Sequence, residues 1–312
     1  MPVLVRAHAR LVAMLAAFIA ALALVPALPA AASPIKPSRV AVGAVVDGAT
    51  GLQQPVKGQA FDISFTVVDD AGTLAPLKQA TTFTVSAPDG PPLTGTTTVT
   101  LAKGATGGTI SGAIYSSFGN GVVLNITGGS LAPGRITVNV LAQAYRGPKL
   151  TPGVDGGVTV SNPGCVEATS ELPVCLSALV LPNGGQGFPT LSAGSCVGIV
   201  DCQGLLVEAL ANLKTTADDG TVVSLYTRDH PATMVIRCDK SLCGSGGVPS
   251  YRLTADVGNG FTDAPPCPSK GVISSDSTLP DFCYDTVAST RDNSGDLIAY
   301  VLFAGDVRAS FK

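Results

Sequence analysis

Short runs in which apolar and polar residues alternate recur along most of this 312-residue chain. A period of two places successive side chains on opposite faces, as a half-buried β-strand requires. The clearest run is FDISFTVV, whose apolar side is formed by Phe61, Ile63, Phe65 and Val67. Further runs follow at TTFTV, TTTVTL, GTISGAI, GVVLNI and RITVNVL, separated by turn-forming segments such as PDGPP and LAPG. About seven short strands in this stretch predict a β-sandwich over residues 37–145.

This succession of strands and turns resembles the Ig-like domains that bacteria use in exported surface proteins. The resemblance covers about residues 37–145 and rests on strand spacing rather than on a specific motif. Because the chain has no Trp and this segment has no Cys, the Cys–Trp–Cys core of antibody domains is absent. The resemblance therefore implies the disulfide-free bacterial type, a sandwich with no inherent active site.

The second half predicts another β-rich domain, over residues 165–312, after a linker at 146–164 that contains the strand-like GVTVS. Its strand-like runs are TVVSLYTR, ATMVIRCD, SYRLTADV, CYDTVAST and DLIAYVLFAGDV. One segment, CQGLLVEALANLKTT, predicts a short helix, because apolar residues recur there at helical spacing at Leu206, Ala209, Leu210 and Leu213. The chain as a whole is thus predicted to be all-β with one short helix.

Two segments of this half, RCDKSLCGSGGVPSY and FCYDTVASTRDNSGDLIAYVLFAGDVRASF, resemble the ends of exported proteins of high-GC Gram-positive bacteria. That resemblance covers about residues 165–312. It implies a Cys-rich exported domain and brings no activity with it.

The first 32 residues have the organisation of a signal peptide. Arg6 and Arg10 precede an apolar run from Leu11 to about Leu28, and the small residues 30–32 match a cleavage site. A membrane anchor is the alternative, since about 20 apolar residues can span a bilayer, but Pro26 and Pro29 interrupt the run. We expect a secreted, extracellular protein without stable membrane insertion after cleavage, and association with the cell wall stays open.

All eight cysteines lie in the second half, which in an exported protein predicts disulfides rather than thiols or metal ligands. Eight cysteines allow 105 pairings, and the sequence alone does not select one. Short separations and turn-forming residues between neighbours favour four local bridges: Cys165–Cys175, Cys196–Cys202, Cys238–Cys243 and Cys267–Cys283. Loss of Arg6 and Arg10 with the signal changes the formal net charge from −3 to −5. A mildly acidic chain without basic clusters is a poor candidate for binding nucleic acid.

Catalytic chemistry finds little support in the sequence. After signal cleavage His230 is the one histidine; Asp229 adjoins it, but no G-x-S-x-G elbow is present, and Ser245 in CGSGG matches only in its glycines. A zinc site needs several His or Cys at set spacings. Carboxylates that could serve a glycosidase also suit turns; they are Asp218, Asp219, Asp281, Asp285, Asp292 and Asp296. We therefore predict no catalytic residue, no cofactor and no structural metal.

The segment STRDNSGDLIAYVLF allows two interpretations. Asp292, Asn293 and Asp296 are spaced like calcium ligands, but an EF-hand needs flanking helices and a Glu at position twelve, where this chain has Phe303. Asp-Asn-Ser-Gly between two alternating runs instead predicts a β-hairpin turn. The hairpin is favoured, and a shallower calcium site at the same three residues is the weaker alternative.

These features favour a non-catalytic binding or adhesion protein whose partner is a protein or a glycan at the cell surface. A glycan would need aromatic faces, for which the second half offers Tyr226, Tyr251, Tyr284 and Tyr300. The alternatives are an extracellular hydrolase with its site in the C-terminal half and a structural component of the cell envelope.

Overall fold

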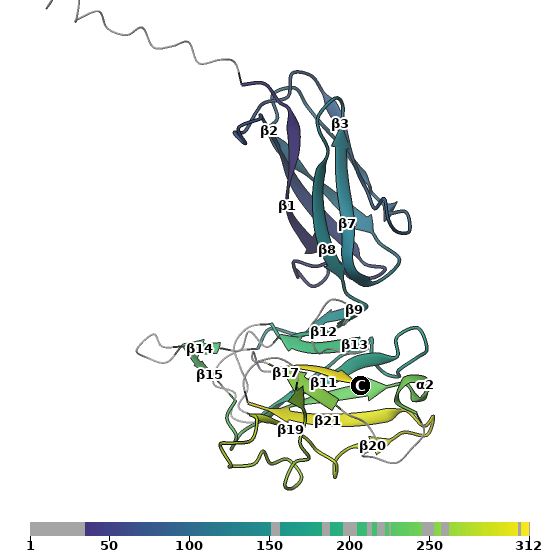
Figure 1. The fold of residues 1–312 in the computed structure, drawn as a ribbon, viewed down its shortest axis with the longest axis vertical. Coiled ribbons are helices and arrows are strands. Elements are labelled where there is room, and N and C mark those ends of the chain that lie inside the picture. The colour runs from purple at the N-terminus through teal and green to yellow at the C-terminus, as the bar shows by residue number, and fades with distance from the viewer. Residues whose placement is uncertain are drawn as a thin grey trace, which may run out of the picture. The chain divides into compact units, whose positions relative to one another are not determined.

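A computed structural model describes residues 35–150, 157–182, 188–195, 205–210, 214–216, 222–224, 226–244, 253–256, 262–304 and 307–311. These residues form an all-β fold with one short helical turn, as the sequence predicted (Figure 1). The predicted signal peptide lies outside them, as do Cys196, Cys202, Asp218, Asp219, Ser245 and Tyr251.

The first half consists of two four-stranded antiparallel sheets. One has the order β1-β2-β6-β4, and the other has the order β5-β3-β7-β8. The first sheet contains β1 (Arg39–Asp47), β2 (Ala60–Val68), β6 (Gly107–Ile114) and β4 (Thr94–Gly95). The second contains β5 (Thr98–Leu101), β3 (Thr81–Ser86), β7 (Gly119–Gly128) and β8 (Gly134–Val140). Each strand expected between residues 61 and 140 is therefore present.

The apolar side of β2 forms the centre of the first hydrophobic core. Phe61, Ile63, Phe65 and Val67 are all buried, while the residues between them are more exposed. The Phe65 ring lies 4.7 Å from that of Phe83 on β3, so the two sheets meet through aromatic side chains. Complete burial of one such side chain contributes about 1.5–3 kcal/mol. The apolar side of the period-two pattern is thus the strand face that packs in the core.

The described residues of the second half, together with two strands from residues 143–161, form two six-stranded sheets and a separate hairpin. The sheet that concerns function has the order β10-β11-β16-β21-β19, with β20 paired to β21. Its strands are β10 (Val158–Ser161), β11 (Val174–Leu181), β16 (Ala232–Cys238), β19 (Phe282–Tyr284), β20 (Thr290–Arg291) and β21 (Leu297–Phe303). We call it the β16 sheet.

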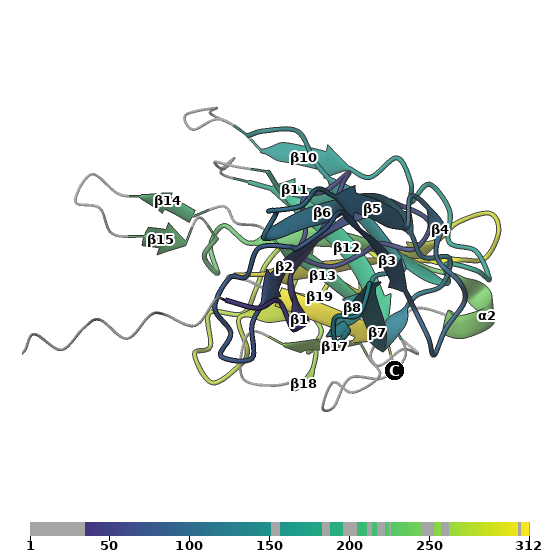
Figure 2. The same cartoon turned by 90° about the horizontal axis from the view of Figure 1, so that it is seen from above.

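The other sheet has the order β18-β17-β22-β13-β12-β9. Its strands are β9 (Gln143–Arg146), β12 (Thr190–Ser195), β13 (Leu205–Leu210), β17 (Leu253–Asp256), β18 (Thr262–Asp263) and β22 (Val307–Phe311). Strands β14 (Lys214–Thr216) and β15 (Val222–Ser224) pair only with each other among the described strands (Figure 2).

Alternation on β16 and β21 gives the β16 sheet an inner and an outer face. Ala232, Met234 and Ile236 alternate with the half-buried Thr233 and Val235. On β21 the same alternation extends from Leu297 to Val301, after which Leu302 is buried as well. The inner row packs in one hydrophobic core together with Leu191 and Ala193 of β12 and Ala309 of β22. The two sheets therefore share this core, and the outer face of the β16 sheet is left for other contacts.

The helix expected over CQGLLVEALANLKTT is wrong. Its residues Leu205–Leu210 form β13, which is hydrogen-bonded to β12 on one side and to β22 on the other. The periodicity of a short apolar run does not distinguish a buried strand from a helix. This segment is a strand because neighbouring strands pair with both of its edges. The described helical turn is instead α2 (Lys240–Cys243), in which the side chain of Asp239 accepts from the Ser241 N–H.

Among the described residues, no helix is both long and apolar enough to cross a membrane.

Three of the four predicted disulfides are confirmed. Cys165–Cys175, Cys238–Cys243 and Cys267–Cys283 are bonded, with Cα atoms 5.9, 6.0 and 5.0 Å apart. The predicted Cys196–Cys202 bridge lies outside the described residues. The confirmed bridges close short loops of the second half, so they hold connections in place next to the strands.

A candidate ligand-binding pocket

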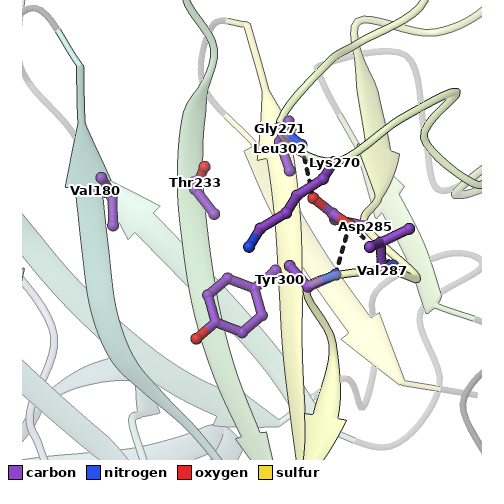
Figure 3. A pocket seen from close by; sticks show the side chains of 9 residues that line it. Val180, Thr233, Lys270, Gly271, Asp285, Val287, Tyr300 and Leu302 are labelled. Carbon is purple, nitrogen blue, oxygen red and sulfur yellow. Dashed lines mark hydrogen bonds between the residues drawn. The ribbon is translucent and has the colours of Figure 1, made fainter.

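A pocket of about 340 Å³ opens on the outer face of the β16 sheet. Its floor is formed by three neighbouring strands: Val180 of β11, Thr233 of β16, and Tyr300 and Leu302 of β21. The rim comes from the two connections that flank β19, namely Lys270, Gly271, Asp285, Val287 and Ala288 (Figure 3). Ligand pockets usually have volumes of about 300–1,000 Å³, so this one has room for a small ligand.

The floor residues meet because of the strand register. Val180 lies opposite Thr233, and Thr233 lies opposite Leu302. Directly opposed side chains on one face of a sheet have Cβ atoms about 4.5–5.5 Å apart, so these three form a continuous row. Tyr300, two residues before Leu302 on the same strand, extends the floor in the strand direction.

The first part of the rim is the connection from Cys267 to Ile273, which is attached to the outer face at several points. Its disulfide to Cys283 joins it to β19, and the Cys267 N–H donates to the carbonyl of Tyr284 at 2.9 Å. Ile273, Cys283 and Leu302 form a small buried cluster beneath it. The connection bends at Gly271, whose φ of +74° falls in the region that favours glycine.

Asp285 joins this connection to the next one. The carboxylate is 2% exposed and accepts three backbone hydrogen bonds. Oδ2 accepts from the Gly271 N–H at 2.8 Å, and Oδ1 accepts from the N–H groups of Val287 and Ala288 at 3.0 and 2.8 Å. Asp285 therefore holds the two parts of the rim together. With both oxygens engaged by backbone donors, it is placed to support the pocket rather than to act on a ligand.

This turn also corrects a sequence expectation. The run CYDTVAST was expected to be one strand, but β19 ends at Tyr284 and β20 begins at Thr290. Because the Asp285 carboxylate accepts from the N–H groups two and three residues further on, the chain turns there instead of extending.

Lys270 is the cation of the pocket. Figure 3 shows its side chain extending from the rim toward the floor residues Thr233 and Tyr300. In the part of the chain that the structure describes, its ammonium makes no hydrogen bond or ion pair. The pocket therefore combines an apolar floor with a positive charge that no described side chain neutralises by direct contact.

A second pocket of about 340 Å³ lies at the same connection and shares Gly271 with the first. Its charged lining residues are Arg228 and Asp229, and the Arg228 guanidinium is already engaged. Nε donates to Asp281 Oδ1 at 2.5 Å, and the terminal nitrogens donate at 2.6 Å to the carbonyls of Ser274, Asp276 and Leu279. Arg228 thus holds the 274–281 segment in place and has little capacity left for a ligand.

The histidine considered for catalysis lies in an exposed turn. The His230 N–H donates to the carbonyl of Thr227 at 3.1 Å. Within the described ranges, its imidazole makes no hydrogen bond or ion pair with an acid or a hydroxyl. The structure thus brings no described orienting group to His230.

Three of the four tyrosines considered as a glycan platform are described, and they do not share one surface, while Tyr251 lies outside the described residues. Tyr226 and Tyr284 are buried in the second core, where the Tyr226 ring contacts Phe303 edge-on at 6.1 Å. Tyr300, in contrast, is half-buried at the pocket floor. A platform that includes Tyr226 and Tyr284 is therefore wrong, because core residues cannot stack on a surface ligand.

The hairpin predicted at STRDNSGDLIAYVLF is confirmed. Thr290 pairs with Ile298 and Arg291 with Leu297, and Gly295 has a φ of +89° in the turn between them. The turn is closed by hydrogen bonds from the Asp292 N–H to the Asp296 carbonyl and from the Gly295 N–H to the Asp292 carbonyl.

The carboxylates of this turn accept from nearby donors. Asp292 Oδ1 accepts from the hydroxyl and N–H of Ser294, and Oδ2 accepts from Arg237 at 3.1 Å. The hydrogen bond from the Ser294 hydroxyl is the largest cause that lowers the pKa of Asp292. The backbone N–H groups of Asp296 and Ser294 and the charge of Arg237 lower this pKa further. Asp296 accepts from the Lys240 N–H and from Ser294, whereas Asn293 is exposed. A calcium ion at these residues would have to compete with Arg237 and with these hydrogen bonds.

Across the described residues, no three or more His, Cys, Asp or Glu side chains are grouped as they would be around a metal ion.

Sequence reasoning missed Lys270 and the outer face of the β16 sheet. A signal for the face was present: the strands ATMVIRC and LIAYVLF have Val235, Ile298, Tyr300 and Leu302 at positions where a solvent-facing row is usually polar. No comparable signal marks Lys270, which stands in a turn-rich segment between Ser269 and Gly271.

Comparison of the chain with models of known protein families, with curated proteins and with solved structures gave no match.

Proposed function

We propose that this protein is an exported, non-catalytic binding protein that holds its ligand in the pocket on the outer face of the β16 sheet. The observation that carries the proposal is the pocket itself: an apolar floor, an unpaired ammonium and a rim attached by a disulfide and by Asp285. Because the N–H groups of Gly271, Val287 and Ala288 in the rim already donate to Asp285, the rim is held in place without a ligand, as small-molecule sites usually are.

Two further observations support work outside the cytoplasm. The described part of the second half has three disulfides, which persist mainly in oxidising compartments such as the extracellular space. The first 32 residues have the charge, apolar run and small residues of a signal peptide.

We infer in addition that the first half is an Ig-like module that serves as a spacer or a second interaction surface. The order β1-β2-β6-β4 matches the A-B-E-D strands of an Ig sandwich, and the order β5-β3-β7-β8 contains the C-F-G succession with β5 added beside β3. The strand order is the observation that supports this inference. The proposed ligand pocket belongs to the second half.

The test compares capture of material from envelope and cell-surface fractions by the purified protein and by two matched variants. Thr233→Arg fills the pocket floor from a central strand. Thr84→Arg makes the same change on the exposed side of β3, in the first half. We expect a captured component that is lost with Thr233→Arg and retained with Thr84→Arg.

Circular dichroism and the thermal midpoint must show that both variants are folded. Equal capture by the wild type and by folded Thr233→Arg would contradict the proposed site. Turnover of an ester, peptide or glycoside substrate that Thr233→Arg abolishes would favour the hydrolase alternative instead.

A further inference from the structure

We propose that the pocket binds a carboxylate that has an apolar chain, with Lys270 as its counter-charge. This inference rests on the proposed function and names the ligand class for the same pocket. The class has two sources, a free aliphatic acid and the carboxyl-terminal residue of a polypeptide with an apolar side chain.

The charge of the pocket selects the head group. Two charged side chains line it, Lys270 and Asp285. Both oxygens of Asp285 accept from the N–H groups of Gly271, Val287 and Ala288, so three backbone dipoles face this carboxylate and offset its field. Lys270 has no such partner among the described residues. An incoming anion therefore gains an ion pair, whereas an amine would meet the ammonium of Lys270.

The floor selects the body of the ligand. Val180 offers methyl groups and Tyr300 offers a ring, while Leu302, which is 1% exposed, closes the floor where it meets the cluster with Ile273 and Cys283. Thr233 is the one hydroxyl-bearing side chain in the row of three opposed residues. A neutral sugar would place several hydroxyls against this row without partners, at a cost of about 1–3 kcal/mol for each buried group. An alkyl or branched aliphatic chain has no such cost and removes apolar surface from water.

The geometry of the pocket also sets the direction in which the ligand would lie. Lys270 reaches the floor from the rim on one side, beside the Gly271 bend (Figure 3). The row Val180–Thr233–Leu302 runs across three strands, roughly 10 Å from end to end at two inter-strand spacings. A carboxylate held by Lys270 can therefore lay its chain across the strands toward β11.

The first experiment titrates the purified protein with octanoate at low ionic strength and follows backbone amides by NMR. Octanamide and octylammonium keep the chain and change the head group. We expect octanoate to shift the amides of Gly271, Thr233 and Tyr300 in a saturable manner. Octanamide should bind about fivefold more weakly, as expected for loss of one partly exposed ion pair, and octylammonium more weakly still.

Two lysine variants test the counter-charge. Lys270→Gln removes the ammonium from the exposed rim, and Lys103→Gln makes the same change in the exposed turn between β5 and β6. We expect Lys270→Gln to lower octanoate affinity about fivefold and to bring it to the level of octanamide. Lys103→Gln should bind octanoate as the wild type does.

A second arm separates the two sources. Acetyl-alanyl-leucine with a free carboxyl group is compared with its amide and with octanoate. Tighter binding of the free peptide identifies a polypeptide carboxyl terminus, and tighter binding of octanoate identifies a free acid; either result supports the ligand class.

Equal affinities for octanoate and octanamide, octanoate binding that is unchanged in Lys270→Gln, or shifts confined to residues outside the pocket would overturn the inference. These results leave the proposed function standing if Thr233→Arg still abolishes capture from the cell fractions. Unchanged capture by Thr233→Arg would instead remove the proposed function, whatever octanoate does.

Discussion

Replacement of the buried Asp285 by alanine should be among the most destabilising single changes in the connections of the second half. The side chain accepts hydrogen bonds from Gly271, Val287 and Ala288, and so joins two connections that are 14 and more residues apart in sequence. The variant removes both carboxylate oxygens and with them all three hydrogen bonds, although its own backbone N–H can still donate to the Tyr300 carbonyl.

The magnitude follows from what the three N–H groups can regain. Hydrogen bonds to a charged group contribute about 1.5–3 kcal/mol each when the freed partner stays buried. Val287 is 69% exposed, and Gly271 lies in an exposed bend, so water can reach part of the freed backbone. We therefore expect a loss of about 2–4 kcal/mol for Asp285→Ala, well below the sum of three buried bonds. Asp285→Asn should lose less, because its amide oxygen can still accept from one side.

Urea unfolding followed by far-UV circular dichroism measures the loss, since the chain has no Trp to report by fluorescence. Amide hydrogen exchange locates it, with the largest gain in exchange expected at Gly271, Val287 and Ala288. The matched control is Asp69→Ala in the first half, where Oδ1 accepts only from Ala71 and Thr73 in a surface turn. A change below about 0.5 kcal/mol for Asp285→Ala, comparable to an ordinary surface substitution, would refute the reasoning.

Three other predictions address the remaining supports. Arg228→Lys should destabilise the 274–281 segment by about 1–3 kcal/mol and raise its hydrogen exchange, because an ammonium cannot reproduce donation to Asp281 and three carbonyls; exchange like that of the wild type would contradict this role. Reduction of the disulfides should accelerate hydrogen exchange in the second half and leave exchange at residues 37–140 unchanged, because each confirmed bridge closes a small loop and stabilises the second half by about 2–3 kcal/mol. Equal acceleration in both halves would argue against separate domains. The pKa of Asp292 is lowered in the folded state, so its contribution to stability is present above the unfolded pKa and is lost as the pH falls through the folded pKa. Asp292→Asn should therefore reduce the loss of stability on acidification from pH 5 to pH 2, and an acid-unfolding profile like that of the wild type would contradict this prediction.

The inner faces of the sheets were predictable because a strand face depends only on neighbours two residues apart. Phe61, Ile63 and Phe65 alternate with polar residues, and all three are buried as expected. The hairpin was predictable for a similar reason, since its turn residues and both paired runs are contiguous. LLVEAL was not, because its apolar residues suit both periods and the partners of β13 lie on other segments of the chain.

Asp285 shows how one side chain can override local strand propensity. The residues after it, Thr286 and Val287, favour a strand by type. The carboxylate nevertheless accepts from the N–H groups of Val287 and Ala288, and these donors are then lost to a sheet ladder. The third bond, to Gly271, comes from a connection that precedes β19, and no local pattern specifies it. The turn at Asp285 therefore depends on both connections that flank β19.

The pocket could not be assembled from the sequence because its parts meet only through long-range register. Val180, Thr233 and Leu302 are separated by more than 50 residues from one to the next, yet pairing of β11 with β16 and of β16 with β21 places them in one row. A shift of either pairing by one residue would turn one of these side chains to the core. The buried rows of Met234 and Ile236 on β16 and of Ala299 and Val301 on β21 prevent that shift, since their exposure would cost the burial of several apolar groups. The inner core thus fixes the outer site: the residues that form the floor need no mutual attraction, because the packing on the opposite face of the same strands determines where they lie.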